Sequence, residues 1–562
     1  MISVNPGLIL VLGALVVPLL RGNARGVAML ALSLAGLAYS LLLPSGGSDP
    51  ASFLDFDLVL LRVDPLARAF GGVFFVAAAL AALFGFQDRD PIAQTAALVY
   101  AGGAIGAVFA GDLITLFVFW ELTAISSVFL VWAGGTERAY RAGLRYLIVQ
   151  VGSGVILLAG LIIHAAETGS VAFDHLGLAG PGPVLILVAI GIKCAFPLLH
   201  AWLADAYPEA SPAGTVWLSA FTTKLAVYAL ARGYAGTEIL IWIGAVMTVF
   251  PIVYAVLADD LRRVLAHSLN IQLGFMVAAI GVGGAMAING AVAHALGHIL
   301  YKALLFMTIG AVLTQSGTAK ASDLGGLWRS MPWTAACCVV GAASISAVPL
   351  FSGYASKSLI LAVVAGGGHF VPWLLLLTAS AGVIAYAGVK VPYAAFFAPD
   401  RGLRCSEAPW NMRLAMAIAA VACIAMGALP QMFYSLLPYP VSYDPYTVDH
   451  VVGQLQLLLF AALALVVLQR AGLYPWTAGR ELVDVDILYR RGLPALARWF
   501  VRSFGPIDRA VRRITVDAFR RLVTQIYRHQ GPAGALTRTA NAGNMVFWVI
   551  VMLAGYLVIY FV

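Results

Sequence analysis

Ionisable side chains stand inside several apolar stretches of this 562-residue sequence. Lys193 lies within the run LILVAIGIKCAF, and Pro197 follows it closely. A lysine ammonium group at the centre of a membrane costs about 3 kcal/mol on insertion scales, so it marks a functional site by default. Pro197 lacks a backbone donor and predicts a broken helix. The alternative is a lysine near a helix end whose amine reaches the membrane surface.

A second group of ionisable residues recurs at helical spacing. In AVAHALGHILYKALLFM, His294, His298 and Lys302 are four residues apart, which places them on one face of a helix. Histidine titrates near neutral pH and can pass protons between its neighbours. Two histidines at this spacing also occur in metal sites, but the sequence has no H-E-x-x-H glutamate and no third ligand nearby, so we expect no metal.

Lysine and arginine are distributed differently along the chain. Only six of the 34 basic residues are lysines, and four of the six fall within apolar stretches: Lys193, Lys224, Lys302 and Lys357. A buried lysine can release its proton, whereas arginine stays charged. Glu121, in DLITLFVFWELTAISSVFLVW, is the one acidic residue deep inside such a stretch. We expect it to interact with Lys193, either as a fixed ion pair or as part of a switch.

The composition excludes an ordinary soluble protein. Hydrophobic residues make up 61% of the chain and charged residues 11%. Repeated apolar runs of about 20 residues predict a polytopic, all-α membrane protein. The five cysteines have no C-x-x-C spacing, so we expect no cofactor, cluster or disulfide framework. The net charge of +8 comes largely from a C-terminal arginine-rich segment, and we expect no nucleic-acid partner.

About sixteen transmembrane helices are predicted, with both termini facing away from the cytoplasm because the basic loops should face it. Pro197 and Pro349 predict breaks in helices 7 and 12, five helices apart. This spacing predicts two inverted five-helix repeats. The expected organisation is N-terminal helices 1–3 in 1–90, repeats in 91–234 and 235–398, helices 14–15 in 399–475, a lateral helix in 476–542, and a final span in 543–562.

The lateral helix is predicted from a basic amphipathic pattern around residues 506–529. Apolar residues recur at helical spacing between pairs of arginines in PIDRAVRRITVDAFRRLVTQIYRH. Such a helix lies along a membrane surface, with its basic face toward water or anionic lipid. We expect it either to touch lipid alone or to brace a neighbouring membrane subunit.

Several stretches together resemble the antiporter-like subunits shared by Mrp-type Na+/H+ antiporters, complex I and membrane-bound hydrogenases. They are LFVFWELTAISS, IKCAFPLLHAWLADAYPEASPAG, TKLAVYALAR, DDLRRVLAHSLNIQLGF, HALGHILYKALLF and SAVPLFSGYASKSLI. The resemblance implies a fourteen-helix core with inverted repeats. It also implies proton-translocating roles for a set of residues that match the family's motifs: Glu121, Lys193, Lys224, His298, Lys302 and Lys357, with His294 beside them.

The chain departs from the family pattern in two places. It reads Leu203-Ala204-Asp205-Ala206-Tyr207 where Leu-Pro-x-Ala-His is frequent, and His267 stands where tyrosine is frequent. We treat His267 and His200 as accessory polar residues. Lysine at 357 fits the D-type Mrp subunits better than relatives that have glutamate there. The extended tail resembles longer relatives, so the parent complex stays open.

The resulting hypothesis is a proton-translocating subunit of a multisubunit complex in the cell inner (plasma) membrane. A charge arriving near Glu121 would weaken its attraction for Lys193, whose proton would then pass by Lys224 and His298 toward Lys357. The expected partners are other membrane subunits, H+, Na+ and the lipid bilayer. Three alternatives remain: the pumping arm of a redox-driven complex, a self-sufficient transporter, and a membrane enzyme, for which no nucleophile–base pair or phosphate loop is present.

Overall fold

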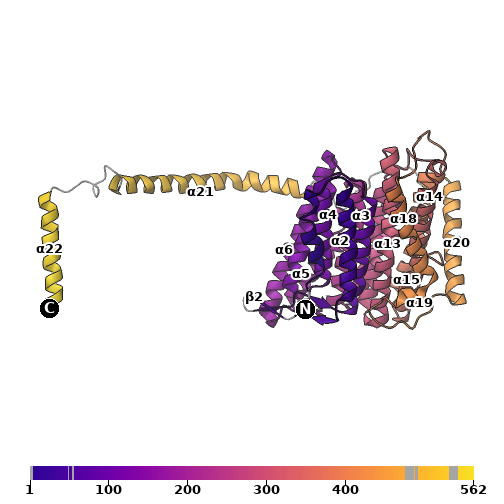
Figure 1. Ribbon diagram of the computed structural model, residues 1–562, viewed down its shortest axis with the longest axis horizontal. Helices are drawn as coiled ribbons and strands as arrows, with labels where there is room; N and C mark the ends of the chain where they lie inside the picture. Colours follow the sequence, from indigo (N-terminus) through magenta and orange to yellow (C-terminus); the bar gives the residue numbers. More distant parts are fainter. Residues whose placement is uncertain are drawn as a thin grey trace. The chain divides into compact units, whose positions relative to one another are not determined.

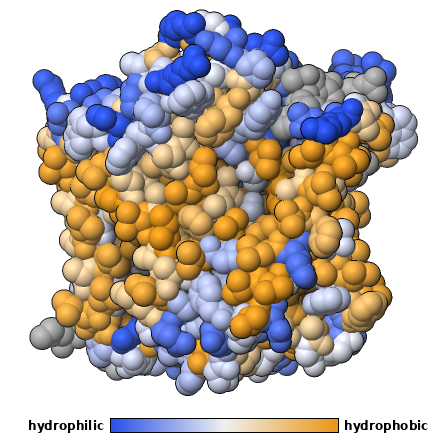
Figure 2. All heavy atoms as spheres, turned by 90° about the vertical axis from the view of Figure 1, so that its right-hand side faces the viewer, coloured by the Kyte–Doolittle hydropathy of each residue, from blue (hydrophilic) through white to orange (hydrophobic). Residues whose placement is uncertain are grey.

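The chain is an all-α, multi-pass membrane protein. The computed structural model describes residues 4–48, 50–53, 56–474, 487, 492–530 and 542–561. Among these residues, twelve helices are long and apolar enough to cross a membrane, and three shorter apolar helices accompany them. Figure 2 shows an apolar belt between two hydrophilic ends. The number sixteen stays a prediction, because four of the expected spans are short or divided and part of the tail lies outside the described residues.

Two compact units make up the chain, Met1–Asp484 and Val485–Val562. The N-terminal part of the first unit (Figure 1) contains α1 (Gly7–Gly13), η1 (Val17–Leu19), α2 (Asn23–Leu42), β1 (Gly46–Gly47), β2 (Ala51–Phe53), β3 (Phe56–Leu58), β4 (Arg62–Val63), α3 (Pro65–Phe84), α4 (Pro91–Val108), α5 (Leu113–Trp132), α6 (Glu137–Thr168), α7 (Pro181–Lys193), α8 (Ala201–Ala206), η2 (Tyr207–Glu209), α9 (Pro212–Ala220) and α10 (Thr222–Gly233).

The remainder of the first unit contains α11 (Ile239–Leu257), α12 (Leu261–Val282), α13 (Gly284–Ser316), η3 (Leu327–Arg329), α14 (Pro332–Ile345), α15 (Ser352–Gly366), α16 (Phe370–Val383), η4 (Ile384–Gly388), α17 (Lys390–Pro392), η5 (Tyr393–Phe397), α18 (Trp410–Ala428), α19 (Pro430–Tyr434) and α20 (Val448–Arg470). The segments η4 and η5 are π-helical turns. The four short strands form two antiparallel pairs, β1 with β4 and β2 with β3.

Helix starts follow from local sequence. Asp64, Asp90, Asp112 and Asp260 each accept hydrogen bonds from backbone N–H groups in the first turn of the helix that follows. A carboxylate there satisfies donors that have no intrahelical partner and offsets the positive end of the helix dipole. These caps lie at membrane-surface loops, so they fix where each span enters the apolar layer.

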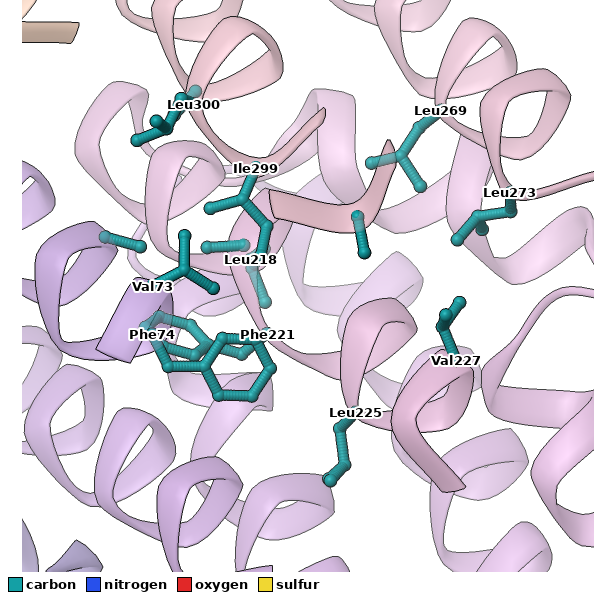
Figure 3. Packing of buried hydrophobic residues seen from close by; sticks show 14 of the residues in the cluster. Val73, Phe74, Leu218, Phe221, Leu225, Val227, Leu269, Leu273, Ile299 and Leu300 are labelled. Carbon is teal, nitrogen blue, oxygen red and sulfur yellow. The ribbon is translucent and has the colours of Figure 1, made fainter. Parts of the chain in front are cut away.

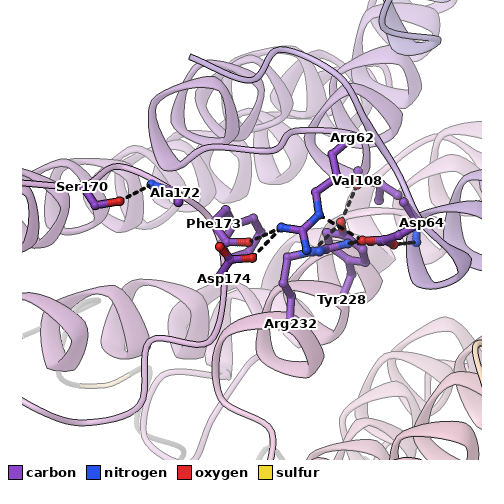
Figure 4. Close-up of polar contacts among 10 residues, drawn as sticks. Arg62, Asp64, Val108, Ser170, Ala172, Phe173, Asp174, Tyr228 and Arg232 are labelled. Carbon is purple, nitrogen blue, oxygen red and sulfur yellow. Dashed lines mark hydrogen bonds and ion pairs between the residues drawn. The ribbon is translucent and has the colours of Figure 1, made fainter. Parts of the chain in front are cut away.

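The two ends of the helical bundle carry different polar contacts. At one end, here called the basic end, Arg25 donates to the carbonyl of Arg89, and Arg138 pairs with Glu209 at 3.1 Å. The opposite end carries a cluster of ion pairs (Figure 4), in which Asp64 accepts from Arg232 at 2.8 Å.

This cluster also binds the loop between α6 and α7. Arg62 pairs with Asp64 at 3.2 Å and with Asp174 at 2.7 Å, and Tyr228 donates to the carbonyl of Val108. The contacts join the start of α3, the end of α4 and the end of α10. They therefore fix the end of α10 that is distant from Lys224.

The apolar core gathers around the junction of α9 and α10. Figure 3 shows Phe221, the residue between these helices, beside Phe74 of α3 and near Ile299 of α13. The rings of Phe74 and Phe221 meet edge to face, with their centroids 5.2 Å apart. The ring of Phe221 also packs on that of Tyr100, with a centroid distance of 5.4 Å. Such pairs contribute about 0.5–1.5 kcal/mol beyond the area they bury. The junction is therefore rigidly held.

The second unit contains α21 (Leu493–Gln530) and α22 (Ala542–Phe561). Residues 506–529 lie within α21, so the predicted amphipathic helix is present, and it continues through Pro506. Its apolar and basic side chains are all exposed within the described part of the chain. The predicted boundary at 475/476 lies outside the described residues. The predicted boundary at 542/543 lies at the start of α22, which begins at Ala542.

Candidate functional site

Helix α7 ends at Lys193, four residues before Pro197, at which the sequence predicts the break. Ala195 and Leu198 have positive φ angles of 61° and 71°, on either side of Pro197. The Phe196 N–H donates to the Gly191 carbonyl at 2.9 Å, five residues back, which widens the last turn. Non-glycine residues with positive φ cost about 1–3 kcal/mol each and are found at functional sites. The break is therefore held by the surrounding structure.

Lys193 is fully buried beside α5. Its Nζ donates to the carbonyl of Trp120 at 2.7 Å and to Oγ1 of Thr123 at 2.8 Å. The ammonium also lies 4.3 Å from the centre of the Trp120 ring. The ring is fixed by its own N–H, which donates to Ser153 on α6. Together these groups replace part of the water that a buried charge loses.

Glu121 follows Trp120 in sequence but faces α6. Its Oε1 has no hydrogen-bond partner among the described residues, and a methyl group added to Gly154 would overlap it. The described contacts include no ion pair within 4.0 Å between Glu121 and Lys193. The two still interact electrostatically over a longer distance. The described residues therefore contain no direct Glu121–Lys193 ion pair, and a longer-range electrostatic interaction remains.

The second break repeats the first in detail. Helix α14 ends at Ile345, Ala347 and Leu350 have positive φ angles of 56° and 74°, and Pro349 stands between them. The Val348 N–H donates to the carbonyl of Ala343, again five residues back. Lys357 lies beyond this break on α15.

The amine of Lys357 returns to the broken end of α14. Its Nζ donates to the Ile345 carbonyl at 2.7 Å and lies 5.2 Å from the centre of the Phe275 ring. Counted from the two prolines, Ile345 corresponds to Lys193 of the first break. A buried ammonium group thus lies at each break. Lys193 precedes the first break in sequence, whereas Lys357 follows the second.

A third interruption lies at Phe221, where the sequence predicts one continuous span. Helix α9 ends at Ala220 and α10 begins at Thr222. Lys224, in the first turn of α10, donates to the Ser219 carbonyl at 2.6 Å and to Oγ1 of Thr223 at 3.2 Å. A carbonyl near a helix end lacks its usual partner and accepts such a bond readily. No proline marks this site, so the sequence pattern missed it.

Helix α13 carries the predicted row of His294, His298 and Lys302, all fully buried. The ring of His294 stacks on that of His298 at 6.1 Å, and Lys302 bonds to Ser268 of α12. The two ring nitrogens of His298 have no hydrogen-bond partner among the described residues.

The row connects to lysines of other helices. His298 lies within electrostatic range of Lys224, Lys302 and Lys357. His294 bonds to Ser356 of α15 at 2.9 Å, directly before Lys357. The fold thus brings His294, His298, Lys302 and Lys357 together around α13. Lys224 approaches them from α10.

The accessory histidines lie elsewhere, against α11. The ring of His200, just before α8, meets Phe250 at 4.5 Å, and His267 stacks on Tyr254 at 5.5 Å. Both aromatic partners belong to α11. The structure therefore groups His200 and His267 with that helix.

Two buried polar residues were missed by sequence reasoning. Lys390, between two π-helical turns, donates to the carbonyls of Val256 and Ala258 at 2.6 and 2.7 Å, which caps the end of α11. Gln272 of α12 accepts from Tyr301 and contacts His294. Lys390 was visible as the one remaining lysine in an apolar context. A neutral glutamine inside a span gives a weaker signal.

The family description "NADH:quinone oxidoreductase/Mrp antiporter, TM" matches residues 110–384, which include every residue of the predicted site. Over these residues the chain resembles the antiporter-like subunits that this family describes. It is 32% identical over 402 residues to the probable K(+)/H(+) antiporter A/B subunit of Rhizobium meliloti (strain 1021), covering 66% of this chain and 40% of that relative. The chain thus spans less than half of the length of that relative.

Two further comparisons show the breadth of the family. The N subunit of NADH-quinone oxidoreductase from Desulforudis audaxviator (strain MP104C) is 34% identical over 328 residues, covering 53% of this chain and 65% of the relative. The structure of the Mrp complex from Dietzia sp. DQ12-45-1b aligns with a TM-score of 0.73 at 24% identity, covering 99% of this chain and 62% of that one. The latter similarity concerns the fold alone.

Proposed function

We propose that this chain is the proton-translocating, antiporter-like subunit of a multisubunit complex that exchanges a monovalent cation, Na+ in the first instance, for H+. The observation that carries the proposal is the set of buried lysines at helix interruptions. Lys193, Lys224 and Lys357 each donate to a backbone carbonyl inside the apolar layer. An amine in such a place can exist with or without its proton, and the carbonyl stabilises the charged form.

The proposed mechanism is electrostatic. A charge that arrives near Glu121 weakens the attraction between its carboxylate and Lys193, and Lys193 releases its proton toward Lys224. The row of His294, His298 and Lys302 then passes a proton to Lys357, which exchanges with one side of the membrane. The long-range geometry supports this scheme, because a direct ion pair would hold Lys193 charged, whereas a distant carboxylate only biases it.

The two inverted repeats, 91–234 and 235–398, are part of the proposal. Two similarities support them. Each break has two positive-φ residues around its proline. Each broken helix also follows a very long helix, α6 with 32 residues and α13 with 33, that ends in a left-handed glycine. Breaks of this kind at corresponding positions are typical of transporters with a site near the membrane midplane.

We further propose the bacterial inner membrane as location, with the basic end toward the cytoplasm and both termini away from it. In α21, basic and apolar side chains share one long helix, which suits the surface of the membrane. We propose that its apolar side contacts a neighbouring membrane subunit while its arginines face anionic lipid. Replacing Val511 and Ile514 by glutamate should reduce co-purification of partner subunits. Arg512→Gln, on the basic side, should leave co-purification unchanged.

Replacement of Lys193 tests the function directly. Everted vesicles containing the chain with its native partner subunits should show cation-dependent proton movement, and Lys193→Ala should abolish it at unchanged assembly. Wild-type transport in that variant would overturn the proposal. The second candidate is the pumping arm of a redox-driven complex, favoured by the similarity to the oxidoreductase relative. Iron–sulfur subunits that co-purify with the chain would decide for it.

A further inference from the structure

Several buried polar side chains that the proposed mechanism does not use lie between the basic end and Lys193. Their series begins with a small cavity of about 20 Å³ near the loop that joins α3 and α4. Asp88, Gln94 and Ser211 line it, and Oε1 of Gln94 has no hydrogen-bond partner among the described residues. This volume is sufficient for one water molecule, which would satisfy the amide.

Asp88 stands at the entrance of this cavity, outside the membrane spans. Much of the residue is exposed, but Oδ2 of its carboxyl group lies beside Gly85 at the wall of the cavity and is partly shielded from water there. This burial, followed by the negative charge of Asp90, raises the pKa of Asp88 to about 6. A carboxyl group of that pKa exchanges protons with water near neutral pH.

Hydroxyl groups continue the series inward. Tyr100 lies almost two turns beyond Gln94 on α4, and its Oη bonds to Oγ1 of Thr222 at 2.6 Å. The phenol groups of Tyr146 and Tyr207 lie close to the same threonine hydroxyl. All four residues are buried, at 0–1% exposure. Each hydroxyl can accept one proton and donate another, as a proton relay requires.

The last members lead to Lys193 along two neighbouring helices. On α5, Ser127 bonds to Tyr146 at 2.9 Å, and Thr123, one turn away, accepts from Lys193 at 2.8 Å. On α6, Gln150 lies one turn from Tyr146, and neither polar atom of its side chain has a partner among the described residues. A fully buried amide with no partner costs about 1–3 kcal/mol unless water bonds to it.

We propose that this series is the route by which protons reach Lys193 from the basic end, and that Thr222 and Gln150 are its essential members. The inference rests on the proposed function, because it presumes that Lys193 is reprotonated. In each step a hydroxyl or bridging water gives its own proton to the next acceptor while it receives one. Every group ends unchanged, and the net result is one proton on the Lys193 amine.

The test compares variants of these hydroxyls in everted vesicles, with transport normalised to assembled complex. Thr222→Val keeps the shape of the side chain and removes its hydroxyl, so the initial rate of proton movement should fall at least tenfold. Thr222→Ser keeps the hydroxyl and should restore at least half of the wild-type rate. Tyr100→Phe and Gln150→Leu should each lower the rate at least fivefold. If one of these variants fails to assemble, the rates of the others still test the route.

Tyr228→Phe is the matched control. Tyr228 is also a fully buried tyrosine on α10, but its hydroxyl bonds to Val108 near the opposite end. It should transport within twofold of wild type. Wild-type rates in Thr222→Val and Gln150→Leu, together with an inactive Lys193→Ala, would overturn the route and leave the proposed function standing. Wild-type transport in Lys193→Ala would overturn both.

Discussion

Substitution of Gly154 by alanine isolates the position of the Glu121 carboxylate without changing its charge. A Cβ atom on Gly154 would overlap Glu121 Oε1, so the carboxylate must move by about 2 Å to reach ordinary contact. Gly152, on the same helix, has open space within 4 Å of the corresponding atom and supplies the control. Both changes raise helix propensity by about 1 kcal/mol, so a loss of activity cannot come from a weaker helix.

The expected magnitude follows from Coulomb's law. Glu121 and Lys193 are farther apart than the 4.0 Å limit of an ion pair. For an assumed separation of about 6 Å and an effective dielectric of about 20, Coulomb's law gives an attraction of about 2.8 kcal/mol. At about 8 Å the attraction is about 2.1 kcal/mol. The difference of about 0.7 kcal/mol corresponds to an approximately threefold change in the protonation equilibrium of Lys193, and hence in transport if that equilibrium limits the rate.

The assay is the initial rate of cation-dependent proton movement per assembled complex in everted vesicles. Gly154→Ala should lower this rate about threefold, and Gly152→Ala should leave it unchanged. In a Glu121→Gln background, Gly154→Ala should have no additional effect, because no charge remains to be displaced. A full threefold effect in that background would refute the electrostatic reasoning and assign the loss to packing of α5 against α6.

Three further predictions concern the lysine switch and the two bundle ends. Lys193→Arg should assemble normally but abolish proton movement in vesicles, because arginine keeps its charge; substantial transport would argue against proton release at this position. Asp64→Asn should lower the free energy of unfolding by about 3 kcal/mol, measured by thermal denaturation in detergent, since it leaves the buried Arg232 without its carboxylate; an unchanged melting temperature would contradict this. The raised pKa of Asp88 makes its contribution to stability greatest below pH 4, and that contribution is lost as the pH rises through about 6. Asp88→Asn should therefore raise the melting temperature relative to wild type at pH 7 and not at pH 4.

Two of the three helix interruptions were predictable from the sequence. Pro197 and Pro349 remove backbone donors in apolar stretches. A missing donor disrupts a helix whatever the rest of the chain does, so it can be predicted locally. The interruption at Phe221 has no such residue. It depends on aromatic packing of Phe221 against Phe74 and Tyr100, which come from other helices. The local sequence around Phe221 therefore does not predict this interruption.

The sequence by itself determined which residues are costly to bury. Glu121 and the four lysines are visible in apolar runs because charge in a membrane is expensive wherever the chain folds. The spacing of His294, His298 and Lys302 likewise defines one helix face without tertiary information. These properties depend only on side-chain chemistry and helix geometry.

The tertiary structure decided which of these groups touch. Glu121 and Lys193 were expected as neighbours, yet Glu121 faces α6 while Lys193 bonds to Trp120 and Thr123. Likewise, the carbonyl that Lys357 binds belongs to Ile345, at the end of a different helix. Direction around a helix and proximity between helices depend on packing among all of them, so no single stretch of sequence carries that information.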